Sequence, residues 1–258
     1  MGHERLGILP RRRPWNDIVS HIRIALEGNV SDTESLASHT LKEVSDRFRR
    51  FPQDTGVQAA FAYLVALSTS EYPANGGLTD INTKLQDNPS PVRITADLAK
   101  WVDSNRASPE YAELACRAAA DTIAKWSREK SAQNLLFDSN ENAQSIWGNS
   151  DGRSFCTIAR TFFAKITERY IRYFIERSAS AEATSIKARQ QLQKVLTNHI
   201  DEISQHAFET AKITQSFAAG WFNKYAKDRR PSDTEISGFL SHAFGKLQEE
   251  LTREDISK

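Results

Sequence analysis

Four residues in the C-terminal third have the types and spacing of a metal site on one helix. His199, Glu202, His206 and Glu209 follow one another at intervals of three, four and three, so all four side chains can share one helical face. Histidine and carboxylate groups on the helices of a bundle bind di-iron and di-manganese centres. These four residues are therefore weak candidate metal ligands, in a helical-bundle enzyme with a His/Glu site.

Two features of this group favour an ordinary structural role instead. The metal motif of such bundles has the order Glu-x-x-His and requires helices that face one another. Here the order is His-x-x-Glu, and no other stretch offers a matching pair of carboxylate and histidine. His199 and His206 also continue the apolar line of Leu192 and Ile213. We therefore expect two partly buried histidines in a helix seam, and no metal or other cofactor.

Basic residues gather in three places. Lysine and arginine neutralise phosphates, and exposed aromatic rings stack on bases. One interpretation is therefore a nucleic-acid-binding surface. The other follows from the spacing of three and four residues, which would place the aromatic rings in the core and the basic side chains on the solvated face of a helix. The three groups are Arg5, Arg11, Arg12 and Arg13; then Arg153, Arg160, Lys165, Arg169, Arg172 and Arg177 beside Phe and Tyr residues; and Lys224, Lys227, Arg229 and Arg230 after Trp221, Phe222 and Tyr225.

Trp147 lies alone in a polar, turn-rich segment, residues 138–153. A tryptophan in such a segment often covers the core, but an exposed one is a good anchor for a partner, because Trp and Arg dominate the binding energy of interfaces. We keep both interpretations open. The candidates for contact with a partner or with nucleic acid are Arg11, Arg12, Arg13, Trp147, Lys224, Lys227, Arg229 and Arg230.

Motifs of known enzyme mechanisms are not evident. Residues 238–246 have the order G-x6-G-K and continue with Leu247, whereas a phosphate-binding loop has four residues between its glycines and Ser or Thr after the lysine. We expect no nucleophile elbow, no zinc-protease motif and no C-x-x-C pair. Cys116 and Cys156 lie in half-apolar helical surroundings, and we expect reduced thiols rather than a disulfide. No catalytic residue is therefore predicted.

The composition and the scarcity of helix breakers predict an all-α fold. Alanine occurs 30 times and valine 8 times, and alanine is the better helix former. No proline interrupts the 121 residues between Pro109 and Pro231. The net charge of +1 gives no overall attraction to nucleic acid or membranes. We expect a multi-helix bundle of about nine or ten helices, with long helices in the C-terminal half.

Local signals place several of these helices. Asp54 is expected to cap a helix that is apolar almost all round, and Ser232 with Glu235 forms a capping box for the last helix. The small polar residues 178–185 are expected to break a long aromatic helix. The predicted division is a basic arm, residues 1–14; an N-terminal helical subdomain, 15–137; a polar linker, 138–153; and a long-helix subdomain, 154–258.

The predicted function is that of a non-enzymatic interaction or adaptor subunit in a larger assembly. Long amphipathic helices offer wide faces for partner proteins or for self-association. Residues 3–10 with Trp15, and residues 217–223, resemble segments of uncharacterised bacterial proteins and indicate no family. The longest apolar run, residues 59–67, is too short to span a membrane, so we expect a cytoplasmic protein without a membrane partner. The alternative is a nucleic-acid-binding protein, for instance in a bacterial phage-defence system.

Overall fold

Helices are the only regular secondary structure in the residues that the computed structural model describes, namely 13–26, 33–69, 90–105, 111–135, 146–147, 150–182, 185–188, 190, 192, 194 and 215–256. Within these ranges there are eight labelled α-helices, one 3-10 helix and no β-strand, which confirms the predicted all-α class. The helices are α1 (Arg13–Leu26), α2 (Thr33–Ser45), η1 (Asp46–Gln53), α3 (Thr55–Leu67), α4 (Pro91–Asn105), α5 (Ala112–Leu135), α7 (Gly152–Glu182), α9 (Gln215–Tyr225) and α10 (Asp233–Ile256).

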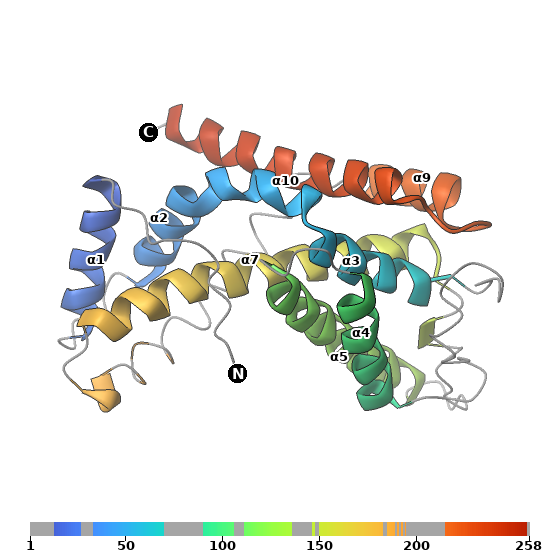
Figure 1. Cartoon of the computed structure of the whole chain (residues 1–258), viewed down its shortest axis with the longest axis horizontal. Helices are drawn as coiled ribbons and strands as arrows, with labels where there is room; N and C mark the ends of the chain where they lie inside the picture. Colours follow the sequence, from blue (N-terminus) through green and yellow to red (C-terminus); the bar gives the residue numbers. More distant parts are fainter. Residues whose placement is uncertain are drawn as a thin grey trace.

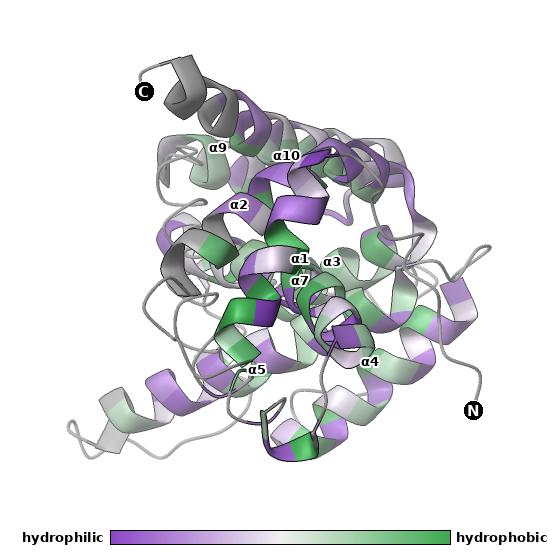
Figure 2. Ribbon diagram, turned by 90° about the vertical axis from the view of Figure 1, so that its left-hand side faces the viewer, coloured by the Kyte–Doolittle hydropathy of each residue, from purple (hydrophilic) through white to green (hydrophobic). Residues whose placement is uncertain are grey.

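Helix α7 is the axis of the molecule. Its 31 residues pack against α1, α2, α3, α5 and α9 (Figure 1). Helix α10 lies across η1 and α3, while α4 packs against α3 and α5. In the end-on view of Figure 2, α7 lies among the other helices. The predicted long helices of the C-terminal half are α7 and α10.

The break expected at residues 178–185 begins later than predicted. Helix α7 continues to Glu182, and Ser178 and Ala179 are both buried. Ser180 donates its hydroxyl to the carbonyl of Glu176, a bond within the helix. Serine and alanine tolerate a helix well when packing holds them there. Tertiary contact therefore extends the helix through most of the segment that local composition marks as a break.

Helix α3 is buried on nearly every side, as its apolar sequence predicts. The carboxylate of Asp54 accepts a hydrogen bond from the backbone N–H of Val57 at 3.0 Å, and this confirms the predicted cap. Phe61 lies at the centre of the core, with its ring centroid 5.3 Å from that of Phe239 and 5.5 Å from that of Phe162. Helices α3, α7 and α10 thus share one aromatic cluster.

Apolar residues on both sides of the predicted linker form one core among the described residues. The ring of Phe51 lies 5.1 Å from that of Tyr170, and Phe61 packs on Phe155. The division into two helical subdomains, residues 15–137 and 154–258, stays a prediction. No described helix has an apolar stretch long enough to cross a membrane.

Two helix contacts depend on glycine. A Cβ atom added to Gly56 of α3 would lie 2.5 Å from the Cβ of Ala112 in α5, and one added to Gly152 of α7 would lie 2.5 Å from the Cβ of Ala219 in α9. Both distances are far below van der Waals contact. The missing side chains allow the first turns of α3 and α7 to approach their neighbouring helices.

Candidate functional site

The basic residues between α9 and α10 form an exposed surface that we call the basic platform. It consists of Lys224, Lys227, Arg229 and Arg230 with the rings of Tyr225 and Trp101. The Lys224 ammonium lies 4.7 Å and the Arg229 guanidinium 5.4 Å from the centroid of the Tyr225 ring. The Arg230 guanidinium lies 5.3 Å from the centroid of the Trp101 ring. Three of the four cations are therefore placed over aromatic faces, which attract them electrostatically.

The rings that hold these cations are themselves fixed by the core. Trp101 of α4 is 8% exposed and donates its indole N–H to the carbonyl of Ala59 at 3.0 Å. Tyr225 packs on Trp221, with centroids 5.9 Å apart, and Trp221 stacks on Phe155 of α7. The platform thus begins with a rigid aromatic base, which reduces the entropy lost when a partner binds.

Arg229 also makes a forked ion pair with Glu235, in the first turn of α10. Nη1 donates to Oε2 at 2.9 Å and Nη2 donates to Oε1 at 2.5 Å. Glu235 further accepts the backbone N–H of Ser232 at 2.8 Å, and the Ser232 hydroxyl accepts the N–H of Glu235. This confirms the predicted capping box. The hydrogen bond from Arg229, followed by that from the Ser232 backbone, lowers the pKa of Glu235 to about 2.

Of the N-terminal basic group, only Arg13 belongs to the described residues, and it lies away from the platform. Arg11 and Arg12 are outside the described residues, and Arg13 is exposed at the start of α1. Helix α1 packs near the far end of α7, through Trp15 and Phe174, whereas α9 packs at Gly152. These two positions on α7 are separated by roughly 33 Å, at 1.5 Å per residue. Arg13 is therefore not part of the basic platform (Figure 1).

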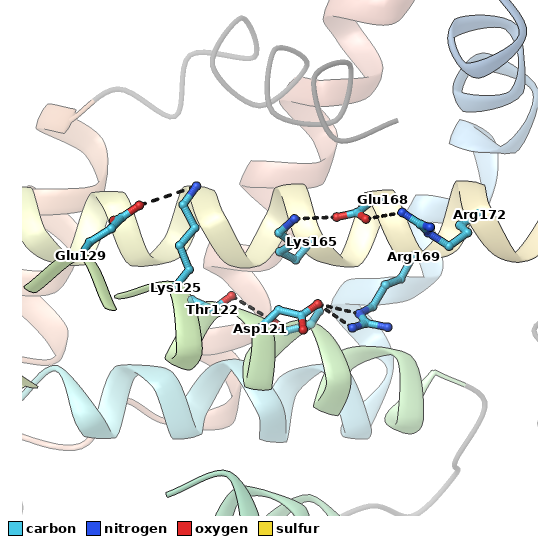
Figure 3. A network of polar contacts seen from close by, with 9 residues as sticks. Asp121, Thr122, Lys125, Glu129, Lys165, Glu168, Arg169 and Arg172 are labelled. Carbon is cyan, nitrogen blue, oxygen red and sulfur yellow. Dashed lines mark hydrogen bonds and ion pairs between the residues drawn. The ribbon is translucent and has the colours of Figure 1, made fainter. Parts of the chain in front are cut away.

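Three of the six basic residues of α7, Lys165, Arg169 and Arg172, pair with acidic neighbours (Figure 3). Both carboxylate oxygens of Glu168 are used: Lys165 donates to one and Arg172 to the other, each at 2.7 Å. Arg169 donates two hydrogen bonds to Asp121 of α5. The Phe residues of α7 and Tyr170 are buried. Helix α7 therefore matches the second interpretation, in which its aromatic rings belong to the core and its basic residues lie on the outer face.

Trp147 is buried, with 1% of its surface exposed. Its ring centroid lies 6.2 Å from that of Trp126, whose indole N–H donates to the carbonyl of Ile146 at 3.1 Å. In this position Trp147 packs against α5. The role of Trp147 as a partner anchor stays a prediction, and it would require the indole to leave this position.

The four residues of the predicted His/Glu site, His199, Glu202, His206 and Glu209, lie outside the described residues. Within the described ranges, no three or more His, Cys, Asp or Glu side chains come together as metal ligands would. Cys116 and Cys156 are free cysteines, and burial raises the pKa of both thiols.

One pattern escaped the sequence analysis. Residues 148–152 read Gly-Asn-Ser-Asp-Gly and match G-x-S-x-G, the pattern of a nucleophile elbow that joins a strand to a helix. Helical residues 146–147 precede it here, and α7 follows. Ser150 donates its hydroxyl to the carbonyl of Trp147 at 2.9 Å, and Asp151 accepts the N–H of Ser154 at 2.8 Å as a helix cap. The described part of the segment, residues 150–152, therefore caps and begins α7.

Comparison with known proteins identifies no relative: no family model, curated protein or solved structure matches this chain. The basic platform is thus assessed from its own geometry. Sequence reasoning found its four cations, but it missed Trp101 as the support of Arg230, because the two residues are far apart along the chain. The role of Glu235 on Arg229 was also missed, although the capping box marked the residue.

Proposed function

We propose that this protein is a non-enzymatic interaction subunit of a larger cytoplasmic assembly, and that it binds an acidic protein partner through the basic platform. The supporting observation is the arrangement of Lys224, Arg229 and Arg230 over the rings of Tyr225 and Trp101. Lys224, Lys227 and Arg229 are exposed while the ring of Trp101 is buried. A positive surface with a rigid base favours rapid and specific association with a negative one.

The distribution of charge favours a protein over nucleic acid as the partner. A nucleic acid would gain most from basic groups that converge on one surface, because each neutralised phosphate releases counterions. Arg13 of α1 lies near the opposite end of α7 from the platform. Lys165, Arg169 and Arg172 are paired with carboxylates. The platform alone is small, which suits a short acidic segment of a protein.

Charge reversal of the platform tests this function. The double variant Lys224→Glu with Lys227→Glu should lose the partner that co-purifies with the wild-type protein from its own cells. Lys187→Glu with Lys194→Glu is the matched control, since both lysines are exposed on helical residues outside the platform, and it should retain the partner. Retention of the same partner by the platform variant would contradict the proposal.

A nucleic-acid ligand would give a different result in the same preparation. The purified wild-type protein would then show a high ratio of absorbance at 260 nm to that at 280 nm, and its binding would weaken steeply with salt. We expect an ordinary protein ratio, with a mass by light scattering that reports the protein assembly. Nucleic acid that is lost on charge reversal of the platform would replace the acidic protein as the partner.

A further inference from the structure

We propose that Glu235 occupies the place on Arg229 that a carboxylate of the acidic partner takes in the complex, so that Glu235 limits the affinity of the platform. This inference rests on the proposed function and specifies how the partner is recognised. The acidic partner must offer carboxylate groups at the platform. One of these carboxylates takes the place of the Glu235 carboxylate on Arg229. The ion pair of Arg229 with Glu235 is thus replaced, in the complex, by an ion pair of Arg229 with the partner.

The geometry of the pair makes such an exchange feasible. Arg229 presents two N–H groups to the two oxygens of Glu235, the forked arrangement by which arginine recognises any carboxylate. The two side chains are 48% and 23% exposed, so a carboxylate from outside can reach the guanidinium. An exchange of one carboxylate for another keeps the number of charge-assisted hydrogen bonds on Arg229.

Arg229 does not depend on Glu235 alone for its position. Its guanidinium also lies over the Tyr225 ring, and Nη1 is 3.3 Å from the carbonyl of Arg230. These contacts hold the cation at the platform when the carboxylate of Glu235 leaves. Arg229 therefore stays available to a partner instead of moving into solvent.

Glu235 also decides the charge of the platform. Residues 224–235 carry four cations, namely Lys224, Lys227, Arg229 and Arg230, and three carboxylates, those of Asp228, Asp233 and Glu235, which leaves a net charge of +1. Removal of the Glu235 charge raises this to +2. The attraction of an acidic segment grows with that charge, but we expect this general contribution to be smaller than the removal of the direct competitor on Arg229.

The variant Glu235→Gln separates the two roles of this residue. Glutamine can replace glutamate in a capping box, because its amide oxygen still accepts the N–H of Ser232. The start of α10 is thereby kept while the negative charge on Arg229 is removed. Glu249→Gln is the matched control: it removes an exposed carboxylate of α10, paired with Lys246, that is about 21 Å further along the helix.

The experiment measures binding of a fluorescein-labelled oligoglutamate peptide by anisotropy at low salt. Glu235→Gln should bind about three- to tenfold more tightly than the wild-type protein, and Glu249→Gln should stay within about twofold of it. In an Arg229→Gln background, the gain from Glu235→Gln should largely disappear. This last comparison separates exchange on Arg229 from a general effect of charge, and circular dichroism confirms that each variant is folded.

The outcomes distinguish this inference from the proposed function. An unchanged affinity for Glu235→Gln, or a gain that persists without Arg229, would overturn the role of Glu235 while the platform function stands. If the peptide also binds Lys224→Glu/Lys227→Glu as well as it binds the wild-type protein, the platform function itself is wrong. If Glu235→Gln raises the affinity for a single-stranded DNA oligonucleotide but not for the peptide, acidic protein is wrong as the ligand class.

Discussion

At the scale of single residues, a missing methyl group decides how closely two helices pack. A Cβ on Gly152 would lie 2.5 Å from the Cβ of Ala219 and 2.7 Å from its Cα, which is backbone and cannot turn away. Gly220 and Gly238 are also helical, but a Cβ at either position would meet nothing within 4 Å. The same substitution should therefore have opposite effects at these positions.

We predict that Gly152→Ala lowers the free energy of unfolding by about 1–3 kcal/mol, because the added carbon forces α7 and α9 apart. Gly238→Ala should instead raise it by up to about 1 kcal/mol, because alanine is the better helix former at an open site. Urea unfolding at equilibrium measures both. The matched control is Gly220→Ala in α9, where an added Cβ would meet nothing within 4 Å. A loss there as large as that of Gly152→Ala would contradict the steric explanation.

The pKa of Glu235 predicts a dependence of stability on pH. The pKa is lowered from 4.5 to about 2 in the folded protein, so the charged pair stabilises the fold at pH values above about 4.5. That contribution is lost as the pH falls towards about 2. The wild-type protein should therefore exceed Glu235→Gln in urea midpoint at pH 7, and the difference should vanish near pH 2. A difference that is independent of pH would assign the effect to packing.

At the scale of elements, α7 carries both a buried aromatic face and a nearly buried ion network. The Glu168 side chain is 11% exposed between Lys165 and Arg172, which are 20% and 22% exposed. The pair of Arg169 and Asp121 is more exposed, at 30% and 38%. Burial strengthens an ion pair but also makes the loss of one partner costly.

Glu168→Gln should accordingly cost about 1–3 kcal/mol of unfolding free energy, since it leaves two part-buried cations without their carboxylate. Asp121→Asn should cost less than about 1 kcal/mol, as expected for an exposed pair. Thermal unfolding followed by circular dichroism compares the two variants. Equal costs would show that burial does not separate these networks.

The sequence predicted helix positions best where the cause is local. The caps at Asp54 and at Ser232 with Glu235 depend on residues three apart, and both are present. The end of α7 was misplaced because the burial of Ser178 and Ala179 comes from other helices. Likewise, the four cations of the platform were visible in the sequence, but the contact of Arg230 with Trp101 is a product of tertiary packing.

At the scale of the whole molecule, one core joins helices from both sides of residues 138–153. We therefore predict a single cooperative transition, with tryptophan fluorescence and far-UV circular dichroism giving the same midpoint temperature. Two separated transitions would support the predicted helical subdomains as independent folding units. The tryptophans suit this measurement, because all five are buried. Trp147 lies within the linker and the other four lie on its two sides.

The contact between Arg230 and Trp101 has a practical consequence: the fluorescence of Trp101 should report the binding of a ligand to the basic platform. The Arg230 guanidinium lies 5.3 Å from the centre of the Trp101 ring, and we expect its charge to influence the emission of that indole. A ligand that draws Arg230 away should change the intrinsic fluorescence in proportion to saturation. Titration of the unlabelled chain would then follow binding directly, and Trp101→Phe should remove the signal while leaving the other four indoles as an internal reference.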